Sequence, residues 1–202
     1  MFGIGFGKKA HIKEEIGEIE SWIIGHSLQF TAETTRGFPA VPQMLLATEA
    51  LAFFLHALRR LAYRPNEAKV WMSSFEPSVR QIVQLFAVTL NGWSGADLDP
   101  EQLAKDVQNL VSTRNLEYQT LPFLTGNLDD RQTVVCSAAR RISEAVDAGE
   151  RPALIAAIHR NLTRVTEAEL ALQAEKLELA LYGNASRPAF GSARPVFGMA
   201  VR

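Results

Sequence analysis

The chain has 202 residues, of which 47% are hydrophobic and 21% are charged, so it is long and apolar enough to bury one sizeable core. Its formal net charge of −1 argues against a dedicated nucleic-acid-binding protein, which usually carries a strongly basic face. Cys136 is the only cysteine, which excludes an intrachain disulfide.

Apolar residues recur at helical intervals along most of the chain, and no stretch shows sustained alternation of apolar and polar residues. We therefore predict an all-α fold, with a single domain of about six to seven helices packed as a bundle or an orthogonal array. This domain is expected over residues 9–183, between a flexible N-terminal arm (residues 1–8) and an irregular C-terminal tail (residues 184–202).

The first helix is predicted from Lys9 to Thr34. Its apolar seam follows a heptad rhythm and consists of Ile12, Ile16, Ile19, Ile23 and Phe30, with His26 on the same seam. The arm before it is glycine-rich and is read as a frayed terminus. The alternative is a membrane-surface anchor, in which the apolar side chains of the arm enter the lipid boundary and Lys8 and Lys9 meet anionic headgroups.

The second helix, from Pro42 to Arg64, is the most apolar run of the chain. Its apolar residues cover most of the helix surface, which predicts a helix buried among the others. A membrane span is disfavoured, because Glu49, His56 and a pair of arginines interrupt the run before it reaches about 20 residues. We expect the remaining helices to surround this one.

Residues 67–75 are predicted to form a short helix or an irregular link. A further helix begins near Pro77 and is expected to end at residues 91–92, an Asn-Gly pair. The loop that follows carries Trp93, which either stacks on a ligand or covers a helix end.

Two capping patterns mark the next helix starts. Asp99 precedes a proline and has a glutamine three residues later, which predicts a helix N-terminus with a capping box. Asp129 with Gln132 repeats this pattern and predicts a helix that runs to Gly149.

The last helical stretch is predicted to kink or break near Thr166, because Thr166 and Glu169 resemble another cap. The final helix presents a wide leucine face made of Leu170, Leu172, Leu177, Leu179 and Leu181. This face is wider than one neighbouring helix normally covers, so we expect part of it to pair with a second copy of the chain in a homodimer.

The tail contains a duplicated heptapeptide of the form RP[AV]FG[SM]A. Its candidate partner-binding residues are Arg187, Pro188, Phe190, Arg194, Pro195 and Phe197. An apolar anchor beside an arginine, presented twice on a flexible segment, is typical of short recognition peptides. The alternative is a low-complexity duplication without a ligand.

One internal site is suggested by three residues, His26, Glu49 and His56. Glu49 and His56 share a face of the central helix, and His26 on the neighbouring helix is able to approach them. A buried carboxylate beside imidazoles is able to bind a metal or to act as acid and base. The alternative is a polar pair that sets the register of two helices.

No motif predicts a metal or a cofactor. The sequence has no Glu-x-x-His pair, no HExxH, no CxxC and no phosphate-binding loop. Absence of these motifs favours a non-enzymatic protein–protein interaction module, such as an adaptor, an assembly factor or a chaperone-like protein. The alternatives are a helical enzyme or a small-molecule or metal sensor that uses the internal His/Glu site, and a peripheral membrane protein anchored by the N-terminal arm.

The expected location is the cytoplasm. The N-terminal sequence has no apolar signal segment followed by a small-residue cleavage site, and its second residue, Phe2, excludes N-myristoylation.

Overall fold

The computed structural model describes residues 4–122 and 133–183, with side chains described from His11 onward. These residues form helices and no strand, which confirms the all-α prediction. The helices are α1 (Ile4–Gly37), α2 (Gln43–Ala62), a 3₁₀ turn η1 (Pro65–Glu67), α3 (Ala68–Ser74), α4 (Glu76–Ser94), α5 (Pro100–Gln119), α6 (Val134–Ser143), α7 (Arg151–Val165), a π-helical turn η2 (Thr166–Leu170) and α8 (Ala171–Tyr182).

Helix α2 lies at the centre of the fold, as its composition predicted. It packs against α1, α4, α5, α6 and α8, and residues 46–58 are all buried. Phe53, Phe54 and Leu58 are fully buried, and each such side chain contributes about 1.5–3 kcal/mol through removal of apolar area from water. Among the described helices, none combines the length and the apolarity that crossing a membrane requires.

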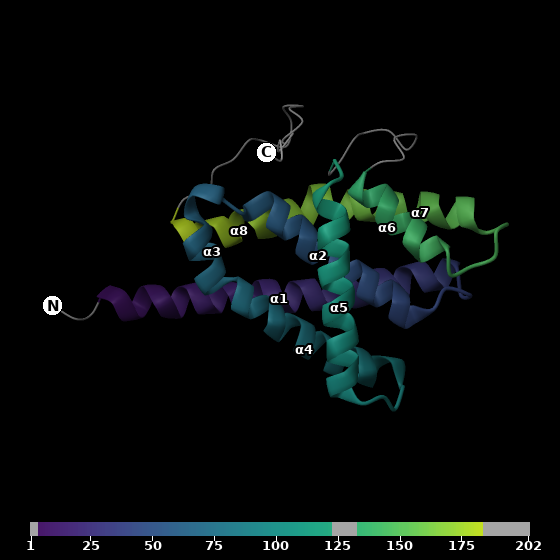
Figure 1. The fold of residues 1–202 in the computed structure, drawn as a ribbon, viewed down its shortest axis with the longest axis horizontal. Helices are drawn as coiled ribbons and strands as arrows, with labels where there is room; N and C mark the ends of the chain where they lie inside the picture. The colour runs from purple at the N-terminus through teal and green to yellow at the C-terminus, as the bar shows by residue number, and fades with distance from the viewer. Residues whose placement is uncertain (1–3, 123–132, 184–202) are drawn as a thin grey trace.

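Two long helical rods flank α2. Figure 1 shows α1 and the continuous α7–η2–α8 rod lying lengthwise, with the chain running in opposite directions, while α5 crosses them steeply. The heptad seam of α1 is buried at Ile16, Ile19, Ile23 and Phe30. Helix α1 begins at Ile4, inside the segment predicted to be an arm, although each glycine there disfavours a helix by about 1 kcal/mol.

Helix α4 is longer than predicted. It continues past the Asn-Gly pair to Ser94 and ends at Gly95, whose φ of +67° is the left-handed conformation that favours glycine. Asn91 does not stop the helix because its side chain instead bonds the backbone of Leu98 in the following loop.

The caps of α5 and α6 differ from the predicted boxes. The Asp99 carboxylate accepts a hydrogen bond from the Glu101 amide at 3.1 Å, so it caps α5 through the second helical residue rather than the third. Helix α6 is capped by Thr133, whose hydroxyl accepts from the Cys136 amide at 3.1 Å. The predicted cap at Asp129 lies outside the described residues.

Helix α6 ends at Ser143, before the predicted end at Gly149. The Ser143 hydroxyl donates to the Arg140 carbonyl at 2.7 Å, and the Arg151 guanidinium donates to carbonyls of residues 144 and 146. The Ser143 bond lies in the last turn of α6, and the Arg151 bonds satisfy carbonyls of the turn that leads to α7.

The predicted kink or break near Thr166 coincides with the π-helical turn: α7 ends at Val165, and the chain stays helical through η2 instead of starting a newly capped helix. The Thr166 hydroxyl is buried and donates to the Leu162 carbonyl at 2.7 Å, one turn back in the same helix, so it does not cap a new one. Residues 166–170 form a single π-helical turn, a feature often found at functional positions.

Candidate functional site

The main buried polar cluster lies along the seam between α2 and α5, and we call it the α2–α5 seam. At its centre, the Arg114 guanidinium donates to Glu49: Nη2 lies 2.6 Å from Oε1, and Nε lies 2.9 Å from both carboxylate oxygens. Glu49 is 1% exposed. Hydrogen bonding to Glu49 holds the pKa of Arg114 above its ordinary value, against the opposing effect of burial.

The cluster continues from α5 to α6 through Glu117. Arg114 Nη1 lies 3.1 Å from one Glu117 oxygen, and the Ser137 hydroxyl donates to the other at 2.7 Å. Arg141 Nε lies 3.5 Å from the same carboxylate. Burial works to raise the pKa of Glu117, but the Ser137 hydrogen bond and the two arginines together lower it.

His56 lies two turns along α2 from Glu49 and faces the residue after Arg114. Its Nδ1 is 2.9 Å from Asn115 Oδ1, so Nδ1 donates and Nε2 carries the lone pair of the neutral ring. Nε2 is buried and has no hydrogen-bond partner. Burial lowers the pKa of His56 to about 4, the Asn115 hydrogen bond opposes this, and Arg60 and Arg59 add to the lowering.

Tyr118 completes the seam beside His56. The two rings pack edge to face with centroids 5.3 Å apart, and the Tyr118 hydroxyl is buried without a partner. Burial raises the pKa of this phenol far above its ordinary value, so the hydroxyl stays protonated. The seam therefore holds an unpaired acceptor at His56 and an unpaired hydroxyl at Tyr118.

His26 belongs to a different contact. Its Nε2 lies 2.5 Å from Glu169 Oε2 on the π turn, its Nδ1 lies 3.1 Å from the Trp22 carbonyl, and its ring stacks on Trp22. Both partners are acceptors, so both ring nitrogens donate together only in the imidazolium form. The structure thus brings Glu49 and His56 to one seam, as predicted, and places His26 on another interface, between α1 and η2.

Sequence reasoning missed Arg114 and Asn115, although a signal for Arg114 was present. The buried face of α5 is formed by Leu103, Val107, Val111 and Tyr118. Arg114 falls on this apolar spacing, one turn after Val111, where a hydrophobic residue is expected. A lone charge on an apolar seam indicates a buried partner of opposite sign, which here is Glu49.

Trp93 is 40% exposed and lies near the end of α4, among other exposed apolar side chains. We define the apolar tip as Leu85, Val88, Trp93 and Leu98, which are 45%, 60%, 40% and 43% exposed. They are four of the eight large hydrophobic residues exposed in the described part of the chain. Residues 81–96 contain no charged side chain.

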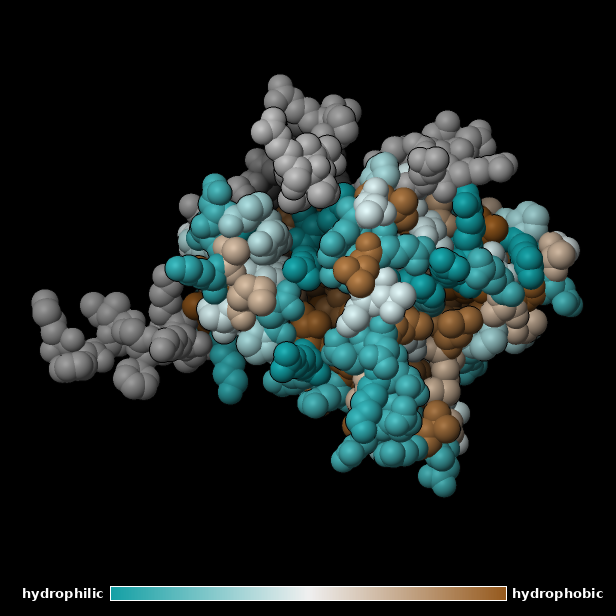
Figure 2. Space-filling view, viewed as in Figure 1, coloured by the Kyte–Doolittle hydropathy of each residue, from teal (hydrophilic) through white to brown (hydrophobic). Residues whose placement is uncertain are grey.

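The Asn91 side chain holds the part of the loop that carries Leu98. Its Nδ2 donates to the Leu98 carbonyl at 3.0 Å and its Oδ1 accepts from the Leu98 amide at 3.3 Å. Figure 1 shows the end of α4 and the start of α5 projecting from the body, and Figure 2 shows hydrophobic residues beside hydrophilic ones on this projection. The loop that carries Leu98 is therefore fixed to the end of α4, while Leu85, Val88 and Trp93 lie on the helix itself.

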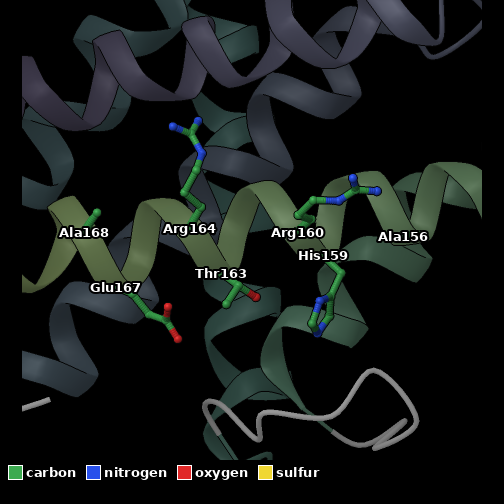
Figure 3. A pocket seen from close by; sticks show the side chains of 7 residues that line it. All are labelled: Ala156, His159, Arg160, Thr163, Arg164, Glu167 and Ala168. Carbon is green, nitrogen blue, oxygen red and sulfur yellow. The ribbon is translucent and has the colours of Figure 1, made fainter. Parts of the chain in front are cut away.

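An open groove of about 730 Å³ runs along α7 and η2, and it does not form a converged site. Figure 3 shows Arg160 and Arg164 pointing to one side of the helix, whereas His159, Thr163 and Glu167 point to the other. Burial lowers the pKa of His159, which favours its neutral form. The cationic and the hydroxyl or carboxylate groups thus do not face a common ligand.

The predicted partner-binding residues of the tail lie outside the described residues. Within the described residues there is no group of three or more His, Cys, Asp or Glu side chains placed to hold a metal ion.

Comparisons of the chain with protein-family models, with curated proteins and with solved structures found no match.

Proposed function

We propose that this protein is an interaction module that binds a partner protein through the apolar tip. The observation that carries the proposal is the charge-free stretch over residues 81–96 with the exposed Leu85, Val88 and Trp93 on it. Tryptophan is among the residues that contribute most to protein interfaces. A contiguous exposed apolar patch marks an interaction site rather than ordinary surface, and the proposal is that these side chains form such a patch.

The rim of the tip indicates the chemistry of the partner. Asp97, Asp99 and Glu101 are all exposed at the start of α5, directly beside Leu98. The best complement is an apolar groove with basic residues at its edge. A second copy docked tip to tip would bring these acids together, and an anionic membrane surface would repel them, so a different protein is the better occupant.

Changing Val88 to Asn and Trp93 to Ser is expected to weaken partner binding by about a hundredfold or more, because hot-spot side chains each contribute about 2 kcal/mol or more. The measurement is photo-crosslinking in the native host with a photoreactive residue at Leu85, followed by affinity determination with the captured protein. Circular dichroism checks that helix content is unchanged.

The matched controls use Leu116, which is 68% exposed on α5 and is not part of the apolar tip. Leu116→Ser is the control for the affinity measurement, and a photoreactive residue in place of Leu116 is the control for the crosslinking. Equal crosslinking from positions 85 and 116, or unchanged affinity in the Val88/Trp93 double variant, would contradict the proposal.

The C-terminal tail is proposed as a second binding element. Two heptapeptides on one chain raise apparent affinity by about 10²–10⁴ when the partner offers two sites. Changing Phe190 and Phe197 to Ala is therefore expected to abolish the association that the tail mediates, while leaving the thermal midpoint of the helical domain nearly unchanged. A double variant that associates like the natural chain would show that the repeat is not a ligand.

Self-association is proposed through α8. Leu170, Leu177 and Leu181 are buried within the chain, whereas Leu172 and Leu179, two turns apart on one face, are 49% and 48% exposed. Light scattering is expected to give the mass of a dimer, and Leu172→Gln with Leu179→Gln should shift it to that of a monomer. A monomer at every accessible concentration of the natural chain would refute this.

The cytoplasmic location stays a prediction.

A further inference from the structure

The outer side of α4 has no partner among the described helices. Helix α4 packs against α1, α2, α3 and α5, and its buried residues are Ile82, Val83, Phe86, Ala87 and Leu90. Leu85 and Val88 fall outside that buried face and lie one turn apart, where they are 45% and 60% exposed. Gly92 continues the same stripe, and the space that a side chain would occupy there is open. A further chain segment is therefore able to approach this side of the helix closely.

The charged groups next to this stripe are all of one sign. Residues 81–104 contain three acidic side chains and no lysine, arginine or histidine. The acids are Asp97, Asp99 and Glu101, and all three are exposed. A segment that carries basic groups beside apolar ones would complement both the stripe and its acidic border.

The C-terminal tail has that composition. Residues 184–202 contain three arginines, two phenylalanines and no acidic residue. Phe197 stands three residues after Arg194 and two after Pro195. The phenylalanine ring is able to pack on the apolar stripe, and the Arg194 guanidinium is able to stack on Trp93, which is 40% exposed. The proline restrains the segment before it docks, so less entropy is lost on binding.

The tail is also long enough to reach the tip of its own chain. It follows Gly183 at the end of α8, and Phe197 lies 14 residues further on, which allows an extended span of up to about 48 Å. Helix α1 has 34 residues and is about 51 Å long. Figure 1 shows that the end of α8 and the projecting end of α4 both lie within the length of α1. A tethered segment that spans the distance has an effective concentration in the millimolar range, which favours its own chain over a second copy.

We propose that the apolar tip is occupied by the tail of the same chain, with Phe197 on the α4 stripe and Arg194 on Trp93 beside the acidic border. This inference rests on the proposed function of the tip as a binding surface, and it adds a regulation of that surface. A partner protein has to displace the tail before it binds the tip.

The test is photo-crosslinking of the purified full chain with a photoreactive residue in place of Leu85, followed by mass spectrometry. Crosslinks to residues 194–200 are expected. In an equal mixture of light-nitrogen and heavy-nitrogen chains, each crosslinked product should carry a single isotope, because the tail and the tip belong to one chain. The control is the same photoreactive residue in place of Leu116, which is 68% exposed on α5 outside the tip and should give far fewer crosslinks to the tail.

Two tail variants assign the contact to one heptapeptide. Phe197→Ala is expected to weaken docking by about tenfold or more, seen as a loss of tail crosslinks from position 85, because the burial of an aromatic ring is lost. Phe190→Ala is the matched change in the other heptapeptide. It should keep most of the crosslinks, because position 190 is only seven residues from Gly183 and has an extended span of up to about 24 Å.

Fluorine NMR of the full chain labelled with fluorotryptophan gives a second readout. Phe197→Ala should shift the resonance of Trp93, which is assigned by its loss in Trp93→Phe. The resonance of Trp71 should stay unchanged, because Trp71 is 1% exposed. Asp97→Asn combined with Glu101→Gln should move the Trp93 resonance in the same direction, since these changes remove charges that attract the arginine.

Three results would overturn the proposal: equal yields of tail crosslinks from positions 85 and 116, tail crosslinks found only between chains of different isotope, or a Trp93 resonance that Phe197→Ala leaves unchanged. Each readout uses the purified chain alone. The proposed function is tested separately by capture of another protein in the native host, so failure of one leaves the other standing.

Discussion

Replacing Arg114 with methionine is expected to lower the free energy of unfolding by about 3–5 kcal/mol, which makes it one of the most damaging single changes in the chain. Glu49 is 1% exposed and receives three hydrogen bonds from the Arg114 guanidinium. Methionine has a similar length but no donor, so the carboxylate would stay buried with its charge uncompensated. Urea unfolding followed by circular dichroism at pH 7 measures the change.

A double-mutant cycle separates this penalty from the value of the pair itself. Combining Arg114→Met with Glu49→Leu removes both charges, and the double variant is expected to recover most of the lost stability because apolar residues often replace a buried ion pair without cost. This outcome would show that the pair sets the register of α2 against α5 and adds little net stability.

The matched control is Arg164→Met. Arg164 Nη2 lies 3.9 Å from Glu33 Oε2, and its side chain is 61% exposed. Exposed pairs of this kind contribute about 0–1 kcal/mol. If Arg114→Met costs no more than Arg164→Met, then the α2–α5 seam does not depend on charge pairing.

Acidification from pH 6.5 to pH 4 is expected to remove about 3 kcal/mol of stability through His56 alone. The pKa of His56 is lowered in the folded chain from 6.5 to about 4, chiefly by burial. Between these two values the unfolded chain takes up a proton that the folded chain does not, so the free energy of unfolding falls as the pH falls. Above pH 6.5 both states are neutral at this position and the contribution is constant.

The measurement is the free energy of unfolding against pH for the natural chain and for His56→Gln. Glutamine is able to bond Asn115 but does not titrate, so the two curves should differ in slope between pH 6.5 and pH 4 and run parallel above it. Parallel curves for His56→Gln over the whole range would contradict a buried neutral histidine.

Two separate polar interfaces hold different helices in position. The α2–α5 seam joins α2, α5 and α6 through Glu49, Arg114 and Glu117, whereas His26 and Glu169 join α1 to the π turn. Figure 1 shows the end of α4 and the start of α5 projecting beyond the other helices.

The helices and the central position of α2 were predictable from the sequence, because helical periodicity and apolar content are local properties of the chain. The cap at Thr133, the end of α6 at Ser143 and the continuation through Thr166 were not. Each depends on whether a hydroxyl caps a helix N-terminus or donates to a carbonyl of its own helix. Packing decides between these two interactions, and sequence spacing does not.

In the candidate site too, some features follow from the sequence and others only from tertiary packing. That Glu49 and His56 share one face follows from their spacing on α2 and needs no tertiary information. That His26 turns instead to Glu169, and that Glu49 meets Arg114, was decided by which helices lie against each other. The two residues of the first contact are separated by 143 positions in the chain and those of the second by 65, so only tertiary packing brings them together. The physical reason is that a buried charge stays in the core only where a partner of opposite sign is within hydrogen-bond reach.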